Sequence, residues 1–200
     1  MQSSGLNVGL LKQLSGQFKQ RYTPPMSQPT STSDSLMSSA FDLAAQLGEA
    51  LEQCGAMVTT AESCTGGGVA HAITAVAGSS RWFSCGFVTY ANSAKHSLLG
   101  VDKQLLERWG AVSEAVVRQM AEGAARVAAA DYAVAISGIA GPDGGSDDKP
   151  VGTVWFAWFG PNGVITKKYQ LSGDRASVRE QAIKISLQQL LHQVTGCNTV

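Results

Sequence analysis

Three short segments of the chain combine side chains that can do chemistry with glycines that free the backbone. The first is Thr60–Gly68, with the sequence TAESCTGGG. A strand is expected to end before Ser63, and the glycines lead into a helix. We expect Ser63 to lie near free backbone N–H groups at that helix N-terminus, a setting that stabilises an oxyanion or a bound anion. Because Ser and Thr before a helix are also ordinary N-caps, the pattern alone leaves both a cap and a nucleophile open.

The second segment is Tyr90–Lys95, with the sequence YANSAK, where a β-rich run gives way to a helix. Three polar side chains at such an edge can converge on one cleft. A lysine in a partly buried site loses its proton more easily and can then act as a base. The alternative is a solvated lysine at the start of a helix, with the tyrosine at the rim.

The third segment runs from Ser137 to Gly145 with the sequence SGIAGPDGG, and KPVGT follows at 149–153. A strand of Ala, Val and Ile delivers Ser137 to a loop dense in glycine. Such a loop lets backbone N–H groups approach a ligand closely. Glycine-rich turns are common, so this segment alone gives only a weak indication of phosphate binding.

Composition excludes several classes of protein. The 200 residues carry 15 basic and 15 acidic side chains, so charge does not favour a nucleic-acid-binding protein. The apolar stretches are interrupted by Arg126 and Asp131, so none reaches the roughly 20 residues of a membrane span. The four cysteines form no C-x-x-C pair, which argues against a metal site or a disulfide framework.

The pattern of apolar residues predicts alternating helices and strands from residue 36 onward. Residues 1–33 contain no acid, and we expect 1–35 to be a disordered or wrongly assigned extension before a domain spanning 36–195. Expected helices cover residues 41–54, 66–77, 93–99, 103–109, 114–129 and 174–193. Expected strands cover 57–60, 81–90, 131–137, 151–159 and 164–171, and the last two flank a Pro-Asn-Gly hairpin turn. This alternation predicts an α/β domain with a mixed sheet and helices on both faces.

Together the strings TAESCTGG, YxNxxK and SGIAGPxGGxxxKPVGTV resemble the C-terminal domain of the CinA family of competence-damage-inducible proteins, over roughly residues 38–192. Two positions depart from the pattern: Ala91 stands where serine is frequent, and Ser137 where threonine is frequent. The resemblance implies a three-layer α/β/α sandwich. It also implies kinship with stand-alone nicotinamide-nucleotide amidohydrolases, which convert nicotinamide mononucleotide into nicotinate mononucleotide and ammonia.

The resemblance also implies roles for individual residues. Ser63 is the expected nucleophile, with Lys95, helped by Tyr90, as the base. The Ser63–Gly66 backbone and the Ser137 hydroxyl are the expected oxyanion donors. The expected substrate-binding residues are Thr65, Gly66, Gly67, Asn92, Gly138, Ala140, Gly141 and Arg175. Cys64 stays open as a rival nucleophile, and Arg175 stays open as a surface ion pair.

The expected partner is a small nucleotide substrate, with neither nucleic acid nor membrane involved. We expect a cytoplasmic homo-oligomer that needs no metal and no cofactor. An alternative from another class is a competence-related or pyridine-nucleotide-binding module without catalysis. The two hypotheses differ in whether the protein releases ammonia from nicotinamide mononucleotide.

Overall fold

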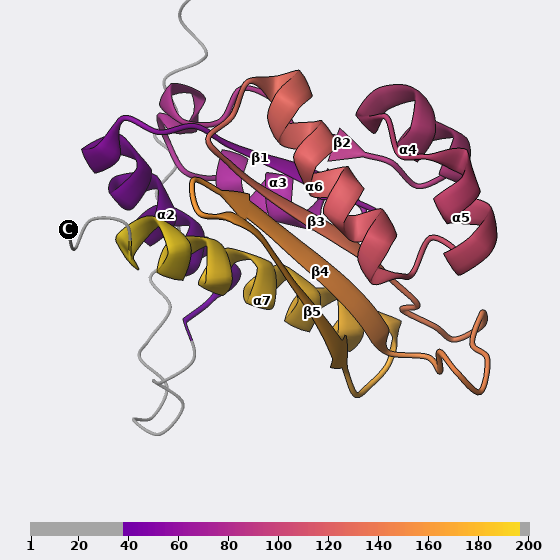
Figure 1. Cartoon of the computed structure of the whole chain (residues 1–200). Helices are drawn as coiled ribbons and strands as arrows, with labels where there is room; N and C mark the ends of the chain where they lie inside the picture. The colour runs from indigo at the N-terminus through magenta and orange to yellow at the C-terminus, as the bar shows by residue number, and fades with distance from the viewer. Residues whose placement is uncertain (1–37, 197–200) are drawn as a thin grey trace, which may run out of the picture. The chain divides into compact units, whose positions relative to one another are not determined.

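A computed structural model describes residues 38–196 and shows one five-stranded mixed sheet (Figure 1). The expected extension, residues 1–35, lies outside the described residues. The spatial order of the strands is β2-β1-β3-β4-β5. The strands are β1 (Val58–Glu62), β2 (Phe87–Val88), β3 (Tyr132–Gly138), β4 (Thr153–Gly160) and β5 (Gly163–Gln170). The first three pair in parallel, and β4 is antiparallel to both of its neighbours.

Helices cover both faces of the sheet, so the expected three-layer α/β/α sandwich is confirmed. One layer holds α2 (Ala40–Cys54), α3 (Gly68–Thr74) and α7 (Arg175–Gly196). The opposite layer holds α4 (Asn92–Leu99), α5 (Lys103–Trp109) and α6 (Glu114–Ala128). Among residues 38–196, no helix combines the length and the apolar character needed to cross a membrane.

Local sequence sets the ends of these elements. Helix α2 begins with a capping box, in which the Ser39 hydroxyl accepts from the Asp42 N–H and the Asp42 carboxylate accepts from the Ser39 N–H. It ends at Gly55, whose φ of 63° is the left-handed conformation that glycine adopts at low cost. The β4–β5 hairpin turns through Pro161 and Asn162, as the sequence predicts.

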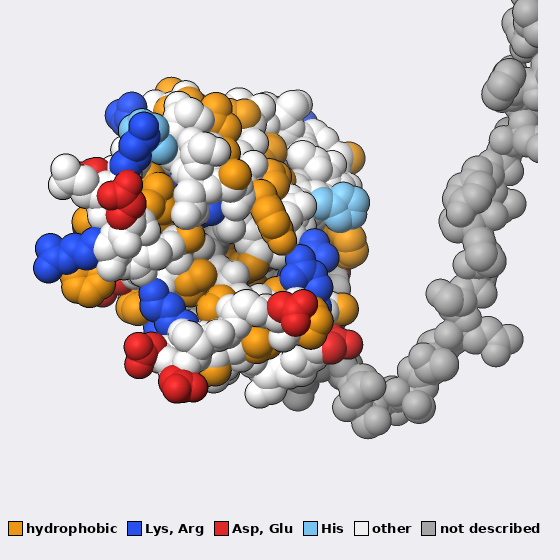
Figure 2. Space-filling view, turned by 90° about the vertical axis from the view of Figure 1, so that its right-hand side faces the viewer, with side chains coloured by type: hydrophobic (Ala, Val, Ile, Leu, Met, Phe, Trp, Pro, Cys, Tyr) orange, Lys and Arg blue, Asp and Glu red, His pale blue; other side chains and the backbone are white. Residues whose placement is uncertain are grey.

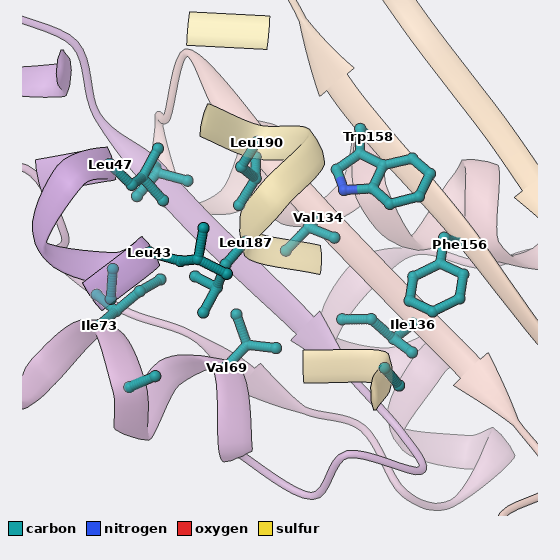
Figure 3. Packing of buried hydrophobic residues seen from close by; sticks show 14 of the residues in the cluster. Leu43, Leu47, Val69, Ile73, Val134, Ile136, Phe156, Trp158, Leu187 and Leu190 are labelled. Carbon is teal, nitrogen blue, oxygen red and sulfur yellow. The ribbon is translucent and has the colours of Figure 1, made fainter. Parts of the chain in front are cut away.

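Two apolar clusters hold the layers together. On the α2/α7 face, leucines four residues apart in α2 pack against α3, α7 and the side chains of β3 and β4 that point toward this helix layer (Figure 3). On the other face, small side chains of the sheet, Ala61, Ala135 and Ala157, let α6 lie close to the strands. Residues of β3 from Tyr132 to Ser137 are therefore buried on both faces, which explains the continuous apolar run in the sequence.

One strand prediction is largely wrong. The β-rich run at 81–90 forms a strand only at Phe87–Val88, and a 3-10 turn occupies Ser79–Arg81. The aromatic residues before it serve as core: Trp82 is buried, and a Cβ added at Gly48 of α2 would lie 2.5 Å from its indole ring. Their backbone pairs with β1 only through one isolated bridge, between Val58 and Phe83, so burial of the side chains explains the apolar run better than an extended strand does.

The chain order makes the carboxyl ends of β1 and β3 a topological switch point, and we call the region between the loops that follow these two strands the crevice. From β1 the chain passes through α3 on one face to β2, and it returns through α4, α5 and α6 on the other face to β3. The connection after β1 and the connection that leads to β3 lie on opposite faces of the sheet, so the loops that follow these two strands diverge. Ligands of open α/β sheets bind between such diverging loops. The loops after β1 and β3 carry the first and third segments of the sequence analysis.

Candidate active site

Ser63 directly follows β1 and is held by its backbone. Its N–H donates to the Ile136 carbonyl of β3 at 3.0 Å, and its carbonyl accepts from the Gly66 N–H at 3.1 Å. The first bond continues the β1–β3 pairing by one residue, and the second closes a tight turn in which Gly66 has a φ of 61°. The hydroxyl of Ser63 is therefore presented at the crevice from a fixed, half-buried position.

Lys95 reaches Ser63 from the first turns of α4. Its side chain is only 1% exposed, and Nζ lies 3.3 Å from Ser63 Oγ. Nζ also donates to the carbonyls of Thr89 at 2.8 Å and Tyr90 at 3.4 Å. Burial lowers the pKa of Lys95 below its ordinary value, because water no longer solvates the ammonium. A neutral amine has two N–H groups and one lone pair, so the two carbonyls can take its hydrogens and leave the lone pair facing Ser63.

Glu62 is a residue next to Ser63 that the sequence analysis did not single out. It is fully buried, and its carboxylate accepts from the N–H groups of Gly67 at 3.0 Å, Val69 at 3.1 Å and Ala70 at 2.8 Å. The expectation of free N–H groups at this helix N-terminus is therefore wrong: a carboxylate of the chain itself already occupies them. The reading of Ser or Thr as the cap is also wrong, because Glu62 fills that role.

Cys64 lies beside Ser63 but points into the apolar core. Burial raises the pKa of the Cys64 thiol to about 11, with the Glu62 charge adding to the rise and the N–H groups of Cys64 and Thr65 opposing it. A thiol with such a pKa stays protonated at neutral pH and is a poor nucleophile. The geometry thus favours a packed thiol over the rival nucleophile.

Arg175 spans the mouth of the crevice from the start of α7. Its guanidinium donates to the Gly141 carbonyl at 2.9 Å and to the Tyr90 hydroxyl at 3.1 Å. Tyr90 follows β2 and Gly141 follows β3, so the Arg175 side chain crosses the end of β1 that lies between them. The Tyr90 ring is 62% exposed and its hydroxyl contacts Arg175, whereas its contact with Lys95 is through the backbone carbonyl.

Arg179, one turn further along α7, is a second residue that the sequence analysis missed. It donates to the Thr65 carbonyl at 2.9 Å. Its Nε and the Thr65 hydroxyl are buried polar atoms without a partner among the described residues. The available signal was the four-residue spacing of two arginines at the start of a helix, which puts both on one face.

Of the remaining expected site residues, Ser137 and Gly138 lie close to Ser63, whereas the side chains of Ala140 and Asn92 lie elsewhere. Ser137 is buried at the end of β3, level with Ser63. Gly138 follows, and a Cβ there would lie 2.7 Å from Val154, so only glycine fits against β4. Ala140, in contrast, points into the core, which leaves its backbone alone for a ligand. Asn92 opens α4 and lines a separate cavity of about 330 Å³ toward α5.

The surface around the crevice is mostly uncharged. Figure 2 shows the side of the molecule where β1 and β3 end, with charged side chains mainly around the edge and uncharged or hydrophobic ones across the middle. In the part of the chain that the structure describes, no three His, Cys, Asp or Glu residues gather as metal ligands would. A cavity of about 280 Å³ at the opposite end of the sheet contains no residue of the three segments.

Comparisons with known proteins identify the family of the chain. The model of the CinA C-terminal domain matches residues 40–194. Nicotinamide-nucleotide amidohydrolase PncC from Enterobacter agglomerans is 59% identical over 153 residues, which cover 76% of this chain and 93% of that protein. The protein of the same name from Pseudomonas putida is 54% identical over 149 residues, covering 74% and 93%.

Solved structures give the same result. A competence-damaged protein (CinA) superfamily protein from Klebsiella pneumoniae superposes with a TM-score of 0.76 at 39% identity, covering 80% of this chain and 99% of that one. The competence/damage inducible protein CihA from Agrobacterium tumefaciens gives a TM-score of 0.75 at 42% identity, covering 79% and 98%. The chain belongs to the CinA C-terminal domain family.

Proposed function

We propose that this protein is a nicotinamide-nucleotide amidohydrolase that converts nicotinamide mononucleotide and water into nicotinate mononucleotide and ammonia. The observation that carries the proposal is the contact of 3.3 Å between Nζ of the buried Lys95 and Oγ of Ser63. Relatives that are 54–59% identical over most of their length bear the name of this activity, which supports the same assignment.

The geometry suits a reaction in two steps through an ester. Neutral Lys95 takes the proton of Ser63 as Oγ attacks the amide carbon, and it returns that proton to the departing ammonia. Water then attacks the ester carbonyl and gives a proton to Lys95. That proton passes to Ser63 Oγ as the ester bond breaks, so the enzyme is regenerated. The carboxylic acid that forms gives its own proton to the solvent and leaves as the carboxylate.

The negative oxygen formed in each step needs a hydrogen-bond donor. The N–H groups of Ser63, Gly66 and Gly67 already donate within the protein, so we no longer assign them this role. Of the expected donors, the N–H groups of Cys64 and Thr65 and the Ser137 hydroxyl, one strand away from Ser63, keep this role in the proposal.

We assign the phosphate end of the substrate to the mouth of the crevice. Arg175 uses two of its five N–H groups on Gly141 and Tyr90, so others are free to bind phosphate oxygens. The glycine loop from Gly138 to Gly141 then lies beside the ribose. Thr65 and Asn92 stay in the proposal as substrate-binding residues. Their support is weaker than that of Arg175, because neither side chain forms a hydrogen bond with Ser63 or Lys95.

The test is release of ammonia from nicotinamide mononucleotide by the purified chain. Ser63→Ala should lose activity by several orders of magnitude and keep its melting temperature, because it removes one oxygen from a half-buried site. Ser93→Ala, an exposed serine of α4, is the matched control. Binding of the nucleotide without ammonia release from the wild-type protein would instead favour the non-catalytic module. The same preparation tests the homo-oligomer by light scattering, and the metal-free reaction by its resistance to a chelator.

A further inference from the structure

A cavity of about 580 Å³ lies beside the catalytic crevice, on the α6 face of the sheet. Its volume falls within the roughly 300–1,000 Å³ of small-molecule sites. It lies between the start of α6, the end of the glycine loop, and strands β4 and β5. Its lining includes Trp109, Val112, Ser113, Glu114, Trp155 and Lys168.

The register of the sheet connects this cavity to Ser63. Ser137 pairs with Trp155 across β3 and β4, and the bond from Ser63 N–H to Ile136 puts Ser63 level with Ser137. Ala61 and Ala135, two residues before Ser63 and Ser137, and Ala157, two residues after Trp155 in the antiparallel β4, all face α6. Because side chains alternate between the faces, Ser63, Ser137 and Trp155 form a row on that same face. With strands about 4.8 Å apart, the backbone of Trp155 is about 10 Å from that of Ser63.

The row places one aromatic surface within reach of a substrate whose amide lies at Ser63. Trp155 is half-buried and lines the cavity, so part of its indole is open to a ligand. Trp109 also lines the cavity, but the Arg108 guanidinium lies 4.9 Å from the centre of its ring. Of the two tryptophans that line this cavity, Trp155 is the one in the same row as Ser63 and Ser137.

Most of the charged groups of the lining are already engaged within the protein. Glu114 accepts from Arg118 and from the Thr166 hydroxyl, and Lys149 donates to the Trp109 carbonyl. Lys168 pairs with Trp155 from the strand on the far side from Ser137. Ser137 is therefore the neighbour of Trp155 on the side where Ser63 lies.

We propose that Trp155 stacks on the pyridinium ring of the substrate and makes the site selective for ring-nitrogen-substituted, positively charged pyridines over neutral ones. This inference rests on the proposed function, because it takes the amide position from Ser63. A cation on an indole face gains electrostatic attraction in addition to the contact area of two stacked rings. Neutral nicotinamide has the same amide and ring without the positive charge, so it would stack on Trp155 without the electrostatic attraction between cation and indole.

Kinetics with nicotinamide mononucleotide give the first test. Trp155→Leu should raise KM by about 3- to 30-fold, the range of a partly desolvated cation–π contact. Trp155→Phe should recover part of the loss, because an aromatic face remains. Trp109→Leu is the matched control from the same cavity and should leave KM unchanged. Far-ultraviolet circular dichroism and melting temperatures check that each variant is folded.

Titration calorimetry gives a second test that does not need turnover. The probes are 1-methylnicotinamide, which is a cation, and nicotinamide, which is neutral. The wild-type protein should bind the cation more tightly, and Trp155→Leu should abolish the difference. Persistence of the difference in Trp155→Leu, or an unchanged KM, would overturn the inference. Absence of ammonia release from the wild-type protein would contradict the proposed function instead, and calorimetry would still report the preference for the cation.

Discussion

Replacing Lys95 by methionine separates the cost of its burial from its use in catalysis. Methionine has a similar length and no charge, so it fills the space beneath Thr89 and Tyr90 without an amine. The lowered pKa of Lys95 means that the folded protein binds this proton less well than the unfolded chain does. Each unit of the lowering corresponds to about 1.4 kcal/mol of the free energy of unfolding.

The sign of the pH dependence follows from that difference. The wild-type chain has its full stability above the unfolded-state pKa, near 10.5, and loses part of it as the pH falls through the lower folded-state pKa. Lys95→Met removes this pH-dependent part. Its free energy of unfolding, relative to wild type, should therefore be most favourable at low pH and become less so toward pH 10.5. Loss of the hydrogen bonds to two carbonyls adds an offset of about 1 kcal/mol each that changes little with pH.

The activity of the wild-type enzyme should depend on the same protonation of Lys95. The rate of ammonia release by the wild-type enzyme should rise with pH until Lys95 is neutral, because only the neutral amine can accept the proton of Ser63. Lys95→Met and Lys95→Arg should both lose about 10²- to 10⁴-fold in kcat, since arginine stays protonated. The assays are urea unfolding and ammonia release, each from pH 6 to 10, with exposed Lys103→Met as the control. A fully active Lys95→Arg enzyme would refute the assignment of lysine as the base.

Three further outcomes are expected. Cys64→Ala should keep most of the activity, and alkylation of Cys64 should be slow at pH 8, because the thiol has a pKa of about 11; full loss of activity would move the nucleophile by one residue. Glu62→Gln should lower kcat more than it raises KM, because its amide group cannot accept all three N–H groups that position the Ser63 loop; equal changes in both constants would contradict this role. A chain that begins at Ser35 should keep the melting temperature and activity of the full chain, and failure of either would show that the preceding residues contribute to the domain.

The sequence was sufficient for features that depend on local pattern. The leucines of α2 and the continuous apolar run of β3 each follow from spacing or composition, and the helix and the strand that they predict are present. The run at 81–90 shows where composition misleads. Trp82 is apolar because it is buried in the core, and most of this run does not form a strand. From sequence alone, a buried loop and a buried strand have the same apolar composition.

Pairings between distant segments explain why part of the site was out of reach. The first segment suggested a serine at an open helix N-terminus, yet Glu62, inside that same segment, closes it. In the sequence, a glutamate at a strand end is indistinguishable from a solvated one, because its burial depends on how α3 folds back over β1. With this terminus closed, the N–H groups of Gly67, Val69 and Ala70 are not available to a substrate, and the proposed reaction depends on Lys95 and Ser137, which two other elements supply. The chemistry of this site therefore depends on the crossing of three chain segments at the ends of β1 and β3 more than on the motif that first drew attention to it.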